Sequence, residues 1–185
     1  HDLPQMSPGR RVLGVIRPTT EIIGNYSGTG HIGILATAGT VASDSYPIEI
    51  NRFFPNLKVF QEACPMWVPL VENNEHDKPG ADYFIRQHIE RLMAESNQID
   101  TVLLACTHYP LLVAKIRQYL PEGVDLLSQG EIVANSLKDY LERHPLMKES
   151  LTTRGTRKFY TTDAVADFEK HAGIFFGEAL KAFRV

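Results

Sequence analysis

Cys106 and His108 stand two positions apart in the stretch LLACTHYPLL, directly after an apolar run. A cysteine in that place can be a core residue, a metal ligand, half of a disulfide or a reactive thiol. The pKa of a thiol at a helix N-terminus beside an imidazole falls from about 8.5 toward neutral. We therefore expect Cys106 to act as a base or nucleophile. An inert buried cysteine beside a surface histidine is the alternative.

The other cysteine, Cys64, is followed by a proline at the end of an apolar run and is most simply a core residue. Two cysteines are too few for a disulfide framework, so we expect a reducing, cytoplasmic setting. No metal site is expected, because the Cys-x-His pair supplies only two ligands. Cys64, His31 and His76 show no metal-binding spacing around that pair.

Small hydroxyl residues follow another apolar run, HIGIL. Thr37, Gly39, Thr40 and Ser43 come at the start of an expected helix. Free backbone N–H groups and hydroxyls at a helix N-terminus make a site for a carboxylate or a phosphate. We take Thr37 and Thr40 as candidate anion-binding residues, with a simple capped helix as the alternative.

A carboxylate, Glu72, stands at the end of a third apolar run, VPLVE. On these residues alone it is either a solvated loop glutamate or a group that faces a site. The sequence around it does not decide between the two.

A parallel α/β sheet is expected to position these residues, because short apolar runs alternate with amphipathic stretches. The expected strands are residues 10–18, 30–40 (ending in a Gly/Thr turn), 57–65, 99–106, 124–128 and 157–163, with another beginning within 179–185. The expected helices are residues 41–53, 81–96, 110–120, 130–144 and 164–173. Ligands bind beyond the carboxyl ends of strands in open α/β sheets, and both the threonines and Cys106 follow such ends.

The composition excludes several classes of partner. With 185 residues, 43% of them hydrophobic, the chain can bury a core of one large or two small domains. The net charge of −3, without a basic stripe, favours neither nucleic acid nor a membrane surface as partner. The apolar runs are too short to span a bilayer, and the start of the chain is not typical of a signal peptide.

Several motifs together resemble the glutamate racemases of the aspartate/glutamate racemase superfamily. They are LGVIRP, IGILATAGTVASDSY, ACPMWVPLVE, LLACTHYPLL and FYTTD…F, in the family's order and at about its spacing. The resemblance covers the chain from Arg11 to its end. It implies interconversion of L- and D-glutamate, which supplies D-glutamate for peptidoglycan in bacteria.

The resemblance also implies an architecture and a set of site residues. The architecture is two doubly wound parallel-sheet α/β domains that face each other across a cleft, each contributing one cysteine. Catalysis needs no cofactor and no metal. The matching positions here comprise the second catalytic cysteine, a histidine that assists it and contacts substrate, a nearby acidic residue and substrate-binding threonines. They are Cys106, His108, Glu72, Thr107, Thr37 and Thr40.

The family's opening third, which carries the first catalytic cysteine, has no counterpart in this sequence. Cys64 does not replace that cysteine, because Pro65 and Met66 follow it instead of Asn-Thr. We expect the chain to be a fragment or to lack its beginning, and to be inactive alone. Residues 1–18 are expected to end the first domain, 19–127 to form the second, and 128–185 to return to the first.

A smaller departure from the family pattern lies in LLSQG, where Ser128 and Gln129 replace a frequent Asp-Ser. It weakens any role for that turn.

Other functions stay open at this point. A related racemase acting on aspartate or a cyclic amide, a one-cysteine decarboxylase, and a non-enzymatic carboxylate-binding fragment are the alternatives. Glutamate is the expected small-molecule partner, and a homodimer is left open.

Overall fold

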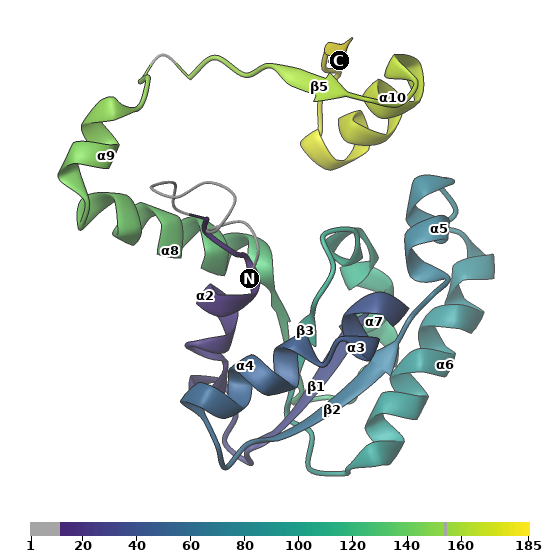
Figure 1. The fold of residues 1–185 in the computed structure, drawn as a ribbon. Coiled ribbons are helices and arrows are strands. Elements are labelled where there is room, and N and C mark those ends of the chain that lie inside the picture. Colours follow the sequence, from purple (N-terminus) through teal and green to yellow (C-terminus); the bar gives the residue numbers. More distant parts are fainter. Residues whose placement is uncertain (1–11, 154) are drawn as a thin grey trace. The chain divides into compact units, whose positions relative to one another are not determined.

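A computed structural model of the protein describes residues 12–153 and 155–185 (Figure 1). The chain divides into two compact units, His1–Lys138 and Asp139–Val185, which are described one at a time. Helix α8 (Gln129–Glu142) begins in the first unit and ends in the second.

The first unit is built on a four-stranded parallel sheet in the order β2-β1-β3-β4. Its strands are β1 (His31–Ala36), β2 (Lys58–Ala63), β3 (Thr101–Leu104) and β4 (Asp125–Ser128). The central strands β1 and β3 are buried along their whole length, as their continuous apolar sequences require. The predicted parallel α/β fold is confirmed for this unit.

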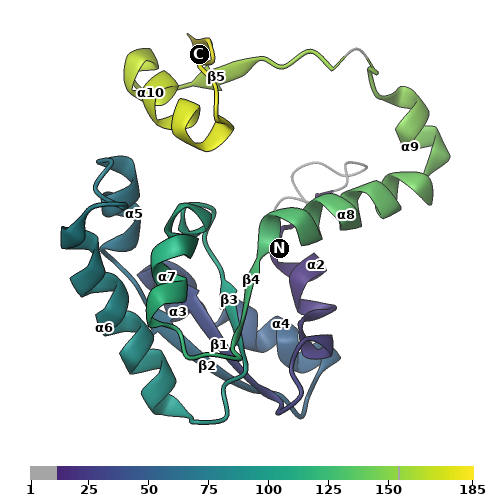
Figure 2. The ribbon, with the colours of Figure 1, turned by 180° about the vertical axis from the view of Figure 1, so that it is seen from behind.

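Helices cover both faces of this sheet, which makes it doubly wound (Figures 1 and 2). On one face α5 (Trp67–Glu72), α6 (Pro79–Glu95) and α7 (Val113–Tyr119) bury an apolar cluster that includes Trp67, Ile85, Leu92 and Ile116. On the other face α4 (Ser45–Phe53) contributes Tyr46 and Ile50 to a second cluster. Both clusters exclude water from the sheet.

The predicted strand at residues 10–18 is wrong where the structure describes it. Residues 12–15 are not a strand, and α2 (Ile16–Thr20) follows them; residues 10 and 11 lie outside the described part. Pro18 is the third residue of this helix, where a backbone N–H has no partner within the helix. The proline that was expected to end a strand therefore fits into a helical turn.

The predicted helix at residues 41–53 is divided in two. Helix α3 (Ala38–Ala42) and helix α4 are separated by Asp44, which has a positive φ of 48°. The predicted helix at 110–120 begins as the 3-10 helix η2 (Tyr109–Leu112) before α7. The other helices expected in this unit are confirmed, whereas α5 and the short 3-10 helix η1 (Ile23–Asn25) were not predicted.

The second unit is small. It contains α9 (Pro145–Ser150), β5 (Phe159–Thr161), α10 (Val165–Phe176) and β6 (Ala182–Arg184), and α9 was not predicted. Strands β5 and β6 pair in parallel as a separate sheet, and α10 ends at Gly177 with φ 76°. The backbone N–H of Ala182 donates to Glu169 Oε1 at 2.8 Å, which joins β6 to α10. Among the described helices of the whole chain, none has the length and apolar content to cross a membrane.

Candidate active site

The sheet topology brings two of the predicted clusters to neighbouring strand ends. The chain leaves β1 toward β2 on one side and reaches β3 on the other, so β1 and β3 flank a topological switch point. Ligands of open α/β sheets bind at such a point, beyond the carboxyl ends of the strands. Leu35 is in register with Leu104, and the backbone N–H of Ala105 donates to Leu35 O at 2.9 Å. The segments that follow β1 and β3 therefore start side by side.

After β1, Thr37 and Thr40 form one small polar group. Thr37 is the N-cap of α3, and its Oγ1 accepts a hydrogen bond from the Thr40 backbone N–H at 3.5 Å. The two hydroxyl oxygens lie 3.0 Å apart. Both residues are partly exposed, so the hydroxyl and N–H groups can reach a ligand at the strand end. The helix-capping alternative is confirmed as a structural role for Thr37, and it leaves these groups at the edge where an anion would bind.

Beyond the end of β3, three residues that span 36 positions of the sequence form a series of contacts. The Sγ of Cys106 lies 3.9 Å from Nδ1 of His108, and Nε2 of His108 lies 3.2 Å from Oε1 of Glu72. Glu72 is the last residue of helix α5, so it is not a loop residue. His108 is partly buried between the thiol and the carboxylate. Thr107, between the cysteine and the histidine, is exposed.

This series defines how a proton can move. An ionised carboxylate only accepts hydrogen bonds, so Glu72 favours the His108 tautomer that carries its proton on Nε2. The Nδ1 atom is then an acceptor and can take the proton of the Cys106 thiol. Glu72 would stabilise the imidazolium that forms, as the carboxylate of a Ser-His-Asp triad does.

The predicted lowering of the Cys106 pKa is wrong. Burial raises the pKa of this thiol, hydrogen bonds from the backbone N–H groups of His108 and Tyr109 lower it, and the negative charge of Glu72 raises it. Together these effects leave the pKa of Cys106 above the ordinary value of a thiol. The expected helix N-terminus is only the four-residue 3-10 helix η2, which offers few aligned peptide dipoles to oppose desolvation.

Cys64 differs from Cys106 in access. It is fully buried at the end of β2, and its thiol lies 3.7 Å from the Glu62 carbonyl oxygen. Burial raises the pKa of Cys64 strongly, and the charges of Glu62 and Cys106 act in the same direction. Both thiols are free, but only Cys106 is partly exposed.

One polar pair was not predicted from the sequence. The Nε2 of Gln129, at the start of α8, donates to the hydroxyl of the buried Tyr46. Burial raises the pKa of Tyr46, the hydrogen bond from Gln129 lowers it, and the charge of Cys106 raises it. Gln129, where the sequence departs from the family pattern, thus has a hydrogen-bond partner. That partner is 83 residues away in the sequence, so local pattern does not reveal it.

A metal centre has no candidate in residues 12–153 and 155–185. Among these residues no group of three or more His, Cys, Asp and Glu side chains is arranged to hold an ion.

Comparison with known proteins identifies the family. No protein-family profile matches the chain. The crystal structure of glutamate racemase isoform RacE1 from Bacillus anthracis superposes with a TM-score of 0.86 at 32% sequence identity, covering 99% of this chain and 67% of that one. The chain belongs to the glutamate racemase family.

Other relatives agree with this placement. The chain is 34% identical to the glutamate racemase of Lactiplantibacillus plantarum over 167 residues, and these residues are 90% of this chain but 60% of the relative. It is 36% identical to the glutamate racemase of Levilactobacillus brevis, of which it spans 56%. The structure of glutamate racemase from Thermus thermophilus in complex with β-chloro-D-alanine matches with a TM-score of 0.79 at 30% identity. The chain thus spans roughly three fifths of the length of its curated relatives.

Proposed function

We propose that this chain is the larger part of a glutamate racemase in which Cys106 exchanges the α-proton on one face of the substrate. The observation that carries the proposal is the series Cys106–His108–Glu72 at the switch point of a sheet that belongs to this family. The product, D-glutamate, would serve peptidoglycan synthesis in the bacterial cytoplasm.

The chemistry requires two acid/base groups. A thiolate on one face removes the α-proton, and the electron pair of the broken C–H bond is delocalised into the adjacent carboxylate. A thiol on the opposite face then donates a proton to the planar carbon. Because Cys64 is buried, the second group has no candidate among the cysteines of this chain. The chain alone should therefore bind substrate at best, without racemising it.

Each candidate site residue has a role in this scheme. His108 accepts the proton from Cys106, and Glu72 stabilises the resulting imidazolium. Thr37, Thr40 and Thr107 would donate hydrogen bonds to the substrate carboxylates, including the one that bears the developing charge. Donors held in place before the reaction are the usual source of such stabilisation. No step in this scheme uses a cofactor or a metal.

We also propose a division of the chain between two domains. Residues 19–127 would form the complete second domain, while 1–18 and 128–185 would belong to a first domain completed by another segment. The separate β5–β6 sheet supports the return of the chain out of the second domain. The homodimer stays a prediction, which light scattering of the complete protein tests.

The decisive experiment compares this chain with a version extended at its N-terminus to the length of its relatives. Circular dichroism would follow L-glutamate and D-glutamate with each protein, and aspartate would serve as the control substrate. We expect racemisation of glutamate only by the extended protein. Racemisation by the 185-residue chain itself, or a preference of the extended protein for aspartate, would contradict the proposal.

A further inference from the structure

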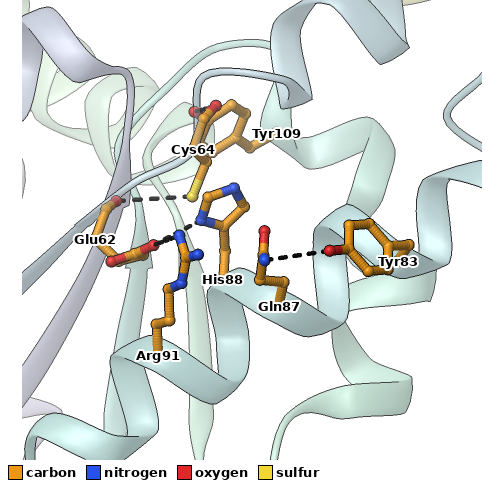
Figure 3. A network of polar contacts seen from close by, with 7 residues as sticks. All are labelled: Glu62, Cys64, Tyr83, Gln87, His88, Arg91 and Tyr109. Carbon is orange, nitrogen blue, oxygen red and sulfur yellow. Dashed lines mark hydrogen bonds and ion pairs between the residues drawn. The ribbon is translucent and has the colours of Figure 1, made fainter.

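Tyr109 directly follows the candidate base His108 and is fully buried. Its backbone N–H lies 3.2 Å from Cys106 O, so it closes the turn that carries the thiol and the imidazole. Its hydroxyl donates to the carbonyl oxygen of Cys64 at 3.2 Å (Figure 3). The backbone N–H of Trp67 donates to the same carbonyl oxygen, also at 3.2 Å. One oxygen atom at the end of β2 therefore joins the start of α5 to the start of η2.

The rings of Trp67 and Tyr109 also meet directly. Their centroids are 4.9 Å apart at an interplanar angle of 63°, an edge-to-face contact. Trp67 is fully buried, and within the described residues its Nε1 has no hydrogen-bond partner. Ring contacts, rather than a hydrogen bond from the indole, therefore fix its orientation.

The Trp67 ring also contacts a buried polar group. The Trp67 ring makes a second edge contact with the ring of His88 on α6, at 6.0 Å between centroids. The Nδ1 of His88 lies 2.6 Å from Oε1 of Glu62 on β2, and Arg91 lies 3.7 Å from the same carboxylate oxygen (Figure 3). The indole thus contacts two residues that are themselves held in place: His88, paired with Glu62, and Tyr109, bonded to Cys64.

We propose that Tyr109 is a positioning residue for the proton-transfer series and acts through Trp67; this role rests on the proposed function. Trp67 begins helix α5 and Glu72 ends it, and a helix of six residues transmits a displacement along its length. The Trp67–Tyr109 contact therefore holds the carboxylate of Glu72 against Nε2 of His108. A displacement of about 1 Å is enough to impair such a series.

A mutant cycle on this chain tests the role without an activity assay. The pH midpoint of Cys106 alkylation is measured by mass spectrometry, with and without Glu72→Gln. Because Glu72 contacts His108 and His108 contacts the thiol, Glu72→Gln removes a charge from the series and should move the midpoint in the wild-type chain. With Tyr109→Leu, which removes the ring, the same substitution should move the midpoint by less than half as much. Tyr109→Phe keeps the ring and should restore the full shift.

The outcomes separate the two proposals. If Glu72→Gln moves the midpoint equally in the wild-type and Tyr109→Leu backgrounds, the positioning role of Tyr109 alone is overturned. The absence of any shift in the wild-type background would overturn the coupling of Glu72 to Cys106, and the positioning role with it.

A second measurement applies if Tyr109→Leu does not fold. Trp67 is the single tryptophan, so 5-fluorotryptophan gives one fluorine resonance. Coupling is reciprocal, so Glu72→Gln should move that resonance, and an unmoved resonance would overturn the role.

Discussion

The two thiols should differ in their rate of alkylation by orders of magnitude. Cys64 is fully buried, so iodoacetamide reaches it only after the chain opens, whereas Cys106 is partly exposed. We take about 5 kcal/mol, the low end of the stability of a small domain, as the free energy needed to open the chain around Cys64. Alkylation of Cys64 is then slowed by a factor of roughly 10³ to 10⁴, because each 1.4 kcal/mol corresponds to about tenfold.

The same experiment tests the sign of the pKa shift. Burial raises the pKa of Cys106 above that of an ordinary thiol, so its thiolate fraction at neutral pH is smaller than that of a free cysteine. The midpoint of its alkylation should therefore lie above about 8.5, the value of a free thiol. The assay is a pH series of iodoacetamide labelling with peptide mass spectrometry, and N-acetylcysteine is the reference thiol.

Two results would refute this reasoning. Labelling of Cys64 at a rate within tenfold of Cys106 would show that burial does not protect it, at the scale given above. A Cys106 midpoint below that of the reference thiol would show that His108 and the backbone donors outweigh desolvation.

Two further predictions concern stability. Burial raises the pKa of Asp100, but hydrogen bonds from Ser27 and Thr29 outweigh it and leave the pKa below its usual value. The contribution of Asp100 is therefore present above the unfolded-state pKa of about 3.9 and lost as the pH falls through the lower folded-state pKa. Asp100→Asn should cost about 1–2 kcal/mol in urea unfolding at pH 7 and a smaller amount at pH 2. His88→Ala should cost about 2–3 kcal/mol in the same assay, because it removes a buried ring and leaves the Glu62 carboxylate with only the more distant Arg91. The exposed Glu90→Ala on the same helix should stay within about 0.5 kcal/mol. An equal loss of stability at both pH values for Asp100→Asn would contradict the hydrogen bonds assigned to Asp100. An equal loss of stability for His88→Ala and Glu90→Ala would contradict the contact assigned to His88.

The sheet could be predicted because its strands have one dominant signal. Strands β1 and β3 are continuous apolar runs buried on both faces, and helix α6 has apolar residues at helical spacing. The strand expected before Pro18 was wrong, since a proline is compatible with both the end of a strand and the first turn of a helix. Local pattern does not separate these two cases.

The site was predictable only in part, and for a related reason. The nearness of Cys106 and His108 follows from their spacing. The contact of Glu72 with His108 was implied only by the family resemblance, because it joins residues 36 positions apart and depends on the unpredicted helix α5. The sign of the Cys106 pKa shift depends on how deeply the thiol is buried, which no motif encodes. Likewise, nothing near Gln129 in the sequence pointed to Tyr46.

The proposed function depends on Cys106 transferring the proton on one face of glutamate. The most direct measurement is α-deuterium uptake in heavy water from each glutamate enantiomer, with the N-terminally extended protein and its Cys106→Ser variant. We expect the wild type to racemise both enantiomers and Cys106→Ser to reduce racemisation by at least about 10²-fold, since positioned acid/base groups contribute roughly 10² to 10⁴. Racemisation by Cys106→Ser within tenfold of the wild-type rate would contradict it.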